Sequence, residues 1–92
     1  MEEQFEKALA YYKNDQLNQS MDLLNQYLNI NTSDLQAFLL RGRIYYRMQK
    51  WGEAMNDYCL VLESDPGNQE AQSGLEMVKN ILCYFTPDMF NP

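Results

Sequence analysis

Histidine is absent from this chain of 92 residues. It is the side chain that most often acts as a general base at neutral pH, ligates metals and activates Ser or Cys nucleophiles. The glycines stand singly, so there is no glycine-rich phosphate loop. The two cysteines, Cys59 and Cys83, lie far apart and have no histidine to complete a zinc set. We therefore expect no cofactor, no metal and no enzymatic activity.

Basic residues and long apolar runs are also scarce. Seven Lys and Arg against 13 Asp and Glu give a net charge of −6, which argues against binding to nucleic acid or anionic membranes. No stretch approaches the roughly 20 apolar residues that span a bilayer, and residues 1–4 lack the layout of a signal peptide. We expect a cytoplasmic protein with reduced thiols, and a single Cys59–Cys83 bridge is the alternative.

Glycine and proline are few, at 4 and 3. The long stretches between them favour helices over a many-turned β fold. Apolar residues recur at helical spacing along these stretches. Residues 65–68 (Asp-Pro-Gly-Asn) strongly favour a turn. The pattern predicts five helices, at about 2–14, 17–30, 35–49, 51–64 and 69–85.

The sequence also repeats itself at a spacing of 34 residues. This shift aligns aromatic and apolar residues with identical ones: Tyr11 with Tyr45, Tyr12 with Tyr46, Met21 with Met55 and Leu28 with Leu62. The shared positions lie at helical spacing, which is typical of repeated helix pairs.

The second copy carries a specific order of large, small and aromatic residues. In chain order these are Phe38, Gly42, Tyr45, Ala54, Tyr58 and a final Pro66. Small residues such as Gly42 and Ala54 allow two helices to cross closely, and the tyrosines fill the space beside the crossing. This order resembles the tetratricopeptide repeat, and residues 1–34 resemble a more divergent copy of it.

The resemblance implies an all-α fold in which antiparallel helix pairs stack as a short right-handed α-solenoid. Residues 1–85 would form one domain, with repeat 1 at 1–34, repeat 2 at 35–68 and a capping helix at 69–85. Residues 86–92 would form an extended C-terminal tail. We also expect an ion pair between Arg41 and Asp57, which lie on opposing helices of the second pair.

The resemblance further implies a non-catalytic protein–protein interaction module that binds a peptide or protein segment in a concave groove. The capping helix would contribute Glu70, Ser73, Met77 and Asn80 to this groove. The binding residues that we expect are Phe5, Leu9, Tyr12, Lys13, Leu39, Arg43, Tyr46, Arg47 and Met77. For Phe5, Leu9 and Leu39, packing between helices is the alternative.

Charge indicates the kind of partner. Residues 35–52 contain four basic side chains and no acidic one, and Arg43 and Arg47, one turn apart, should share a face. A partner with an acidic or carboxylate-ended segment would suit them; a solvated face that balances neighbouring acids is the alternative. A second function, a self-associating structural module, stays open, with a homodimer formed through the groove, the N-terminal edge or the tail 86–92.

Overall fold

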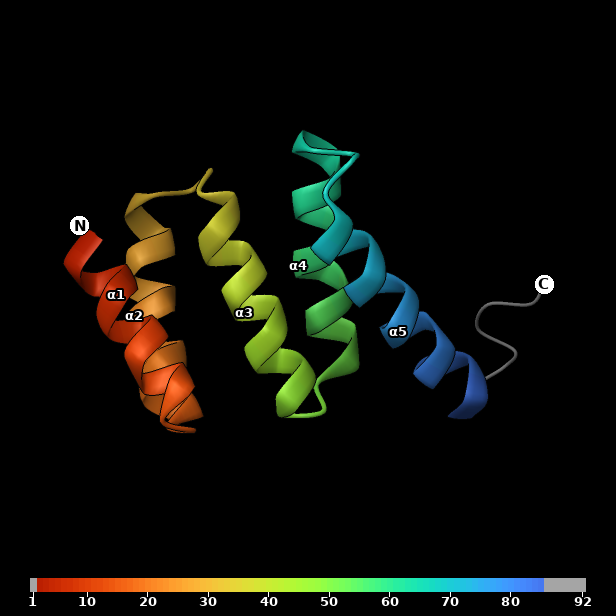
Figure 1. The fold of residues 1–92 in the computed structure, drawn as a ribbon, viewed down its shortest axis with the longest axis horizontal. Coiled ribbons are helices and arrows are strands. Elements are labelled where there is room, and N and C mark those ends of the chain that lie inside the picture. Colours follow the sequence, from red (N-terminus) through yellow and green to blue (C-terminus); the bar gives the residue numbers. More distant parts are fainter. Residues whose placement is uncertain (1, 86–92) are drawn as a thin grey trace.

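Five α-helices and short turns make up the computed structural model, which describes residues 2–85 and the side chains of residues 3–82. Successive helices run in alternating directions, with α1 and α2 at one end and α5 at the other (Figure 1). No strand occurs in residues 2–85, and the expected all-α fold of five stacked helices is confirmed. The helices are α1 (Glu2–Lys13), α2 (Leu17–Ile30), α3 (Leu35–Arg47), α4 (Trp51–Ser64) and α5 (Gln69–Phe85).

Two turns with left-handed backbone end α1 and α3 slightly earlier than predicted. Asp15 and Gln49 have φ angles of 66° and 62°, a conformation that a right-handed helix cannot continue through. The helices therefore stop at Lys13 and Arg47 rather than at 14 and 49.

The same turn thus recurs after 34 residues. The helices that follow the two turns begin at Leu17 and Trp51, and α3 and α5 begin at Leu35 and Gln69, again at this spacing. The recurrence supports the division at 1–34, 35–68 and 69–85, which stays a proposal.

Two clusters of buried side chains form the core, and α3 contributes to both. The first joins α1, α2 and α3, and the second joins α3, α4 and α5, while Phe38 packs against both clusters. The first contains Ala8, Leu24, Tyr27, Leu28, Ala37, Leu40 and Ile44. The second contains Leu39, Ala54, Tyr58, Val61, Ala71 and Val78.

Tyr58 is the residue on which three helices meet. It is 3% exposed, and its ring packs against Gly42 of α3 and Gly74 of α5. A Cβ atom at position 42 would lie 3.0 Å from Cε1 of the ring, and one at position 74 would lie 2.5 Å from Cζ. The close helix approach predicted at Gly42 is therefore present, and a second one at Gly74 accompanies it.

The predicted Arg41–Asp57 ion pair is also present. Nε and Nη2 of Arg41 each donate to one carboxylate oxygen of Asp57, both at 2.9 Å, and Asp57 is 2% exposed. Nη1 of Arg41 donates to Asn25 of α2 at 3.0 Å. Hydrogen bonding to Asp57 raises the pKa of Arg41, so the guanidinium remains a cation that connects α2, α3 and α4.

A buried hydroxyl group connects the first pair of helices. Oγ of Ser20 on α2 donates to the backbone oxygen of Ala8 on α1 at 2.6 Å, and Ser20 is fully buried. The equivalent residue 34 positions later is Ala54, which packs without a hydroxyl. The two helix pairs thus use the same small position differently.

Replacing Ser20 with alanine should lower the free energy of unfolding by about 1 kcal/mol, because one buried hydrogen bond is lost. The carbonyl of Ala8 lies within a helix, so it keeps a backbone partner. Urea denaturation of the variant, with Ala54→Ser as the matched exchange at the equivalent position, would measure this. An unchanged denaturation midpoint for Ser20→Ala would show that the hydroxyl contributes nothing.

Candidate protein-binding groove

A pocket of about 230 Å³ is lined by residues of α1, α3, α4 and α5, and we call it the α3 pocket. It is smaller than the roughly 300–1,000 Å³ of typical small-molecule sites, so it suits one bulky side chain better than a cofactor. Its lining residues are Tyr12 from α1, Arg43, Tyr46 and Arg47 from α3, Tyr58 from α4, and Glu70, Ser73, Gly74 and Met77 from α5.

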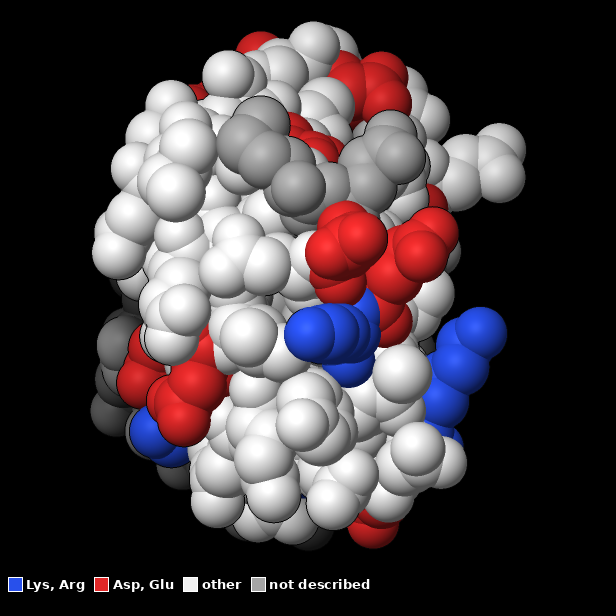
Figure 2. Space-filling view, turned by 90° about the vertical axis from the view of Figure 1, so that its left-hand side faces the viewer, with Lys and Arg blue, Asp and Glu red and all other residues white. Residues whose placement is uncertain are grey.

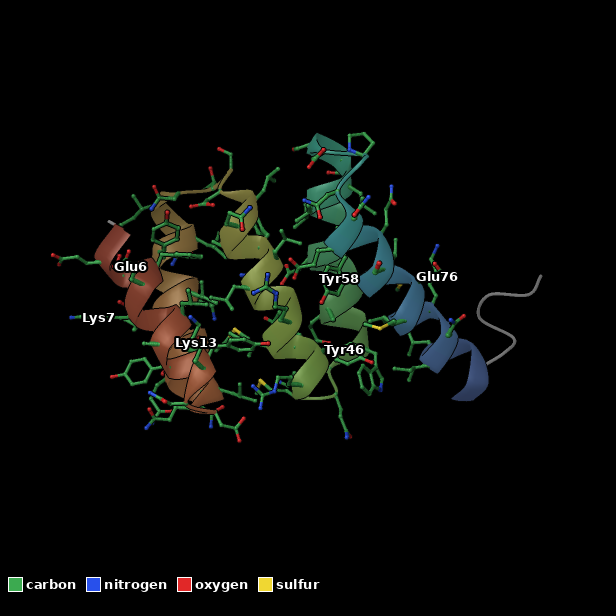
Figure 3. The ribbon with its side chains drawn as sticks, in the orientation of Figure 1. Glu6, Lys7, Lys13, Tyr46, Tyr58 and Glu76 are labelled. Carbon is green, nitrogen blue, oxygen red and sulfur yellow. The ribbon has the colours of Figure 1, made fainter. Side chains whose placement is uncertain are left out.

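Aromatic side chains give the pocket its apolar walls. The rings of Tyr46 and Trp51 meet edge to face with centroids 5.2 Å apart, which fixes the orientation of Tyr46. Tyr46 and Tyr58 lie in the middle of the stack of helices, whereas Glu6 and Glu76 lie on the outer sides of α1 and α5 (Figure 3). Tyr58 is buried and Tyr46 is half-buried, so one ring of the wall is covered by the fold and the other stays accessible.

Each arginine of the pocket already has a carboxylate partner. Nη2 of Arg43 donates to Oε1 of Glu70 at 2.7 Å and Nε donates to the second oxygen. The hydrogen bonds that Arg43 donates to Glu70 raise the pKa of Arg43, which stays charged. Arg47 pairs with Asp15 and lies over the ring of Tyr12, with Cζ 5.3 Å from its centroid. The positive charges of the pocket are therefore balanced from within the chain.

Tyr58 forms the floor of the pocket with an unused polar group. Burial raises its pKa to about 12, so the phenol keeps its proton at physiological pH. No hydrogen bond from its hydroxyl is found within the described residues, and the residue lines the pocket. The hydroxyl can therefore donate to a ligand that enters.

Five of the nine predicted binding residues come together in the pocket, and four do not. Phe5 and Leu9 are partly buried and pack against the first core cluster. Leu39 is 2% exposed and belongs to the second cluster, while Lys13 is exposed outside the lining. The alternative of packing between helices therefore describes Phe5, Leu9 and Leu39. The residues brought together are Tyr12, Arg43, Tyr46, Arg47 and Met77.

Three of the four residues that the sequence places in the groove from residues 69–85 line the pocket on α5. Glu70, Ser73 and Met77 share one face of α5 and line the pocket, whereas Asn80 is exposed outside the lining. Tyr58 and Gly74 were not predicted as pocket residues. For Tyr58 the repeat pattern indicates helix packing alone. The expected groove residues Glu70, Ser73 and Met77 mark the helix face next to Gly74 and are a signal that could have indicated it.

The possible metal ligands and one thiol can be placed in the part of the chain that the structure describes. Residues 3–82 contain no group of three Cys, Asp or Glu side chains placed to hold a metal ion. Cys59 is exposed with a free thiol, and Cys83 falls beyond the described side chains. Among the five helices, none has both the length and the apolar character needed to cross a lipid bilayer.

Comparison with known proteins adds two partial similarities. The chain is 32% identical over 67 residues to the tetratricopeptide repeat protein 21 homolog of Caenorhabditis elegans, which covers 73% of this chain. It is 31% identical over 77 residues, or 84% of the chain, to RNA polymerase II-associated protein 3 of Homo sapiens. The chain spans only 5% and 12% of the lengths of these relatives. No family model matches the chain.

The similarity to a named tetratricopeptide repeat protein agrees with the repeat spacing and with the five-helix fold. The chain is therefore an all-helical protein similar to tetratricopeptide repeat proteins over most of its length.

Proposed function

We propose that this chain is a non-catalytic protein-interaction module that holds a segment of another polypeptide along α1, α3 and α5. One bulky uncharged side chain of the partner enters the α3 pocket. The observation that carries the proposal is the pocket itself. Its walls are aromatic, and its volume suits one bulky side chain. The similarity to a tetratricopeptide repeat protein supports the same class of function.

The residues that we propose to contact the partner are Tyr12, Tyr46 and Met77, with Arg43 and Arg47 at the rim. Met77 is 47% exposed although it is large and apolar. Methionine adapts its shape to varied partners, and tyrosine adds a hydrogen-bonding group to a large contact area. A partner that covers these side chains gains the free energy of removing apolar surface from water.

An acidic or carboxylate-ended partner is a second proposal. Its basis is the run of basic residues on α3, but Glu70 and Asp15 already neutralise Arg43 and Arg47. Such a partner has to displace them. The proposed absence of nucleic-acid partners and the cytoplasmic location rest on the net charge of −6 and on sequence pattern alone.

Self-association is the alternative function, and among the described side chains of α1 and α2 the exposed large apolar residue is Ile30. Figure 2 shows the α1–α2 end, where uncharged residues cover most of the surface between separate groups of acidic and basic side chains. Apart from Ile30, the exposed positions of α2 are mainly amides and one acid: Asn18, Gln19, Asp22, Asn25, Gln26 and Asn29. We therefore favour an external segment over a second copy. The tail 86–92, also proposed for self-association, lies outside the described residues.

The test uses an acetylated and amidated pentapeptide with phenylalanine between paired glycines, titrated into 15N-labelled protein. We expect a Kd of about 1 mM, because a single anchor gives only a few kcal/mol of binding free energy. The amide signals of Ser73, Gly74 and Met77 should shift. The same peptide with alanine in place of phenylalanine should bind at least about fivefold more weakly, since it buries less apolar area.

A pocket-filling variant provides the control. Ser73→Leu places an apolar side chain in the pocket and should abolish the shifts, whereas Gln72→Leu, the neighbouring exposed position outside the α3 pocket, should leave them unchanged. Shifts that are confined to α2, or signals that broaden with protein concentration alone, would contradict the proposal. The second outcome would favour self-association.

A further inference from the structure

Arg43 is engaged by Glu70 in the geometry that an arginine uses to hold a carboxylate ligand. Nε and Nη2 lie on one edge of the guanidinium group and donate to both oxygens of the same carboxylate. Two parallel charge-assisted hydrogen bonds of this kind are the strongest and most specific contacts that arginine makes with an anion. The edge of Arg43 best suited to a ligand is therefore occupied by the chain itself.

The fold holds Glu70 in place without help from a ligand. Asn68 caps the start of α5, because its Oδ1 accepts a hydrogen bond from the backbone N–H of Ala71 at 2.9 Å. Glu70 thus stands in the first turn of the helix, where a negative charge is favoured by the helix dipole. The side chains of Arg43 and Glu70 are 36% and 39% exposed, so the pair lies at the pocket surface, within reach of a ligand.

We propose that Glu70 is a specificity-determining residue that acts as an internal competitor for Arg43 and makes the α3 pocket select uncharged ligands over carboxylates. This inference rests on the proposed function of the pocket. A carboxylate ligand must break two charge-assisted bonds in order to form two, and it then faces the displaced negative charge of Glu70. An uncharged ligand leaves the pair intact and keeps the whole benefit of burying its apolar side chain.

The second ion pair of the pocket is not equivalent. Arg47 and Asp15 are 41% and 70% exposed, and such surface pairs contribute little and are readily broken. Asp15 lies in the turn after α1 rather than among the pocket residues. Removing Asp15 changes the net charge of the protein by the same amount as removing Glu70, but it does not free the edge of Arg43.

The experiment compares two small probes, N-acetylphenylalanine and N-acetylphenylalanine amide, which differ only in the carboxylate. Their dissociation constants are measured from amide shifts of 15N-labelled wild-type protein, Glu70→Gln, Glu70→Ala and Asp15→Asn. The wild type should bind the amide at least as tightly as the acid. Both Glu70 variants should bind the acid about fivefold more tightly relative to the amide, because the charged edge of Arg43 becomes available. Asp15→Asn should keep the wild-type ratio to within about twofold, as expected for a surface pair.

The ratio of acid to amide affinity decides the inference, and the affinity for the amide decides the proposed function. A wild type that already prefers the acid, Glu70 variants with an unchanged ratio, or an equal gain in Asp15→Asn would each overturn the role of Glu70. In all three cases binding of the uncharged amide at Ser73, Gly74 and Met77 would leave the proposed function standing. Thermal unfolding of each variant checks that its fold is intact.

Discussion

Replacing Gly74 with alanine should lower the free energy of unfolding by about 2 kcal/mol, although alanine is the better helix former. The new Cβ would lie 2.5–2.9 Å from three atoms of the Tyr58 ring. Overpacking of this kind typically costs about 1–3 kcal/mol, and a contact this short belongs at or above the upper end. The gain in helix propensity offsets only about 1 kcal/mol of that cost.

The ring of Tyr58 has little room to move away. It is 3% exposed, and a Cβ at Gly42 would also come within 3.0–3.3 Å of it. A second substitution, Tyr58→Leu, removes the ring atoms that the new methyl group meets, so the double variant should lose less stability than the sum of the two single variants.

Gly52 gives a matched control for the same change. It lies in α4, and a Cβ built there meets nothing within 4 Å. Gly52→Ala should therefore stabilise the protein, by up to about 1 kcal/mol. Chemical denaturation of the four variants measures all these effects. If Gly74→Ala were as stable as Gly52→Ala, the close approach of α4 and α5 at Tyr58 would be wrong.

Most of the fold could be predicted because it depends on local signals. The scarcity of glycine and proline indicates where helices run, and the turn sequence 65–68 separates α4 from α5. The Arg41–Asp57 pair could be predicted because helical spacing and the repeat place both residues on facing helices. The helix ends at Lys13 and Arg47 could not, because the left-handed turns at Asp15 and Gln49 contain no glycine that would mark them in the sequence.

The candidate site could be predicted only in part, because its character depends on contacts distant in sequence. Glu70 lies 27 residues after Arg43, and neither helical spacing nor the repeat pairs them. The basic run on α3 therefore suggests a free anion site, although the structure shows it neutralised. Leu39 is adjacent to Leu40 on a helix buried on two sides, so the sequence pattern did not reveal that both side chains are buried.

Replacing Arg41 with methionine should have the largest effect on stability, about 3 kcal/mol, because it leaves the carboxylate of Asp57 buried without its cation. Asp57 is 2% exposed and accepts two of the three side-chain hydrogen bonds that Arg41 donates. The third hydrogen bond, to Asn25, is lost as well. Arg43→Met is the matched control. Its pair with Glu70 is more than one third exposed, so its removal should cost less than about 1 kcal/mol.

The pH dependence of Arg41→Met identifies the cause of the loss. Burial raises the pKa of Asp57, and Arg41 acts in the opposite direction, so in the variant only the effect of burial remains. A carboxyl group whose pKa is higher in the folded than in the unfolded protein binds its proton more tightly when folded. The loss of stability relative to the wild type should therefore be complete at neutral pH and shrink as the pH falls towards the ordinary pKa of aspartate.

Adding Asp57→Asn, which removes the buried charge, should recover part of the loss at neutral pH and abolish this pH dependence. Urea denaturation across this pH range measures the difference, and a loss that stays constant with pH would show that Arg41 stabilises the fold through packing rather than through its charge.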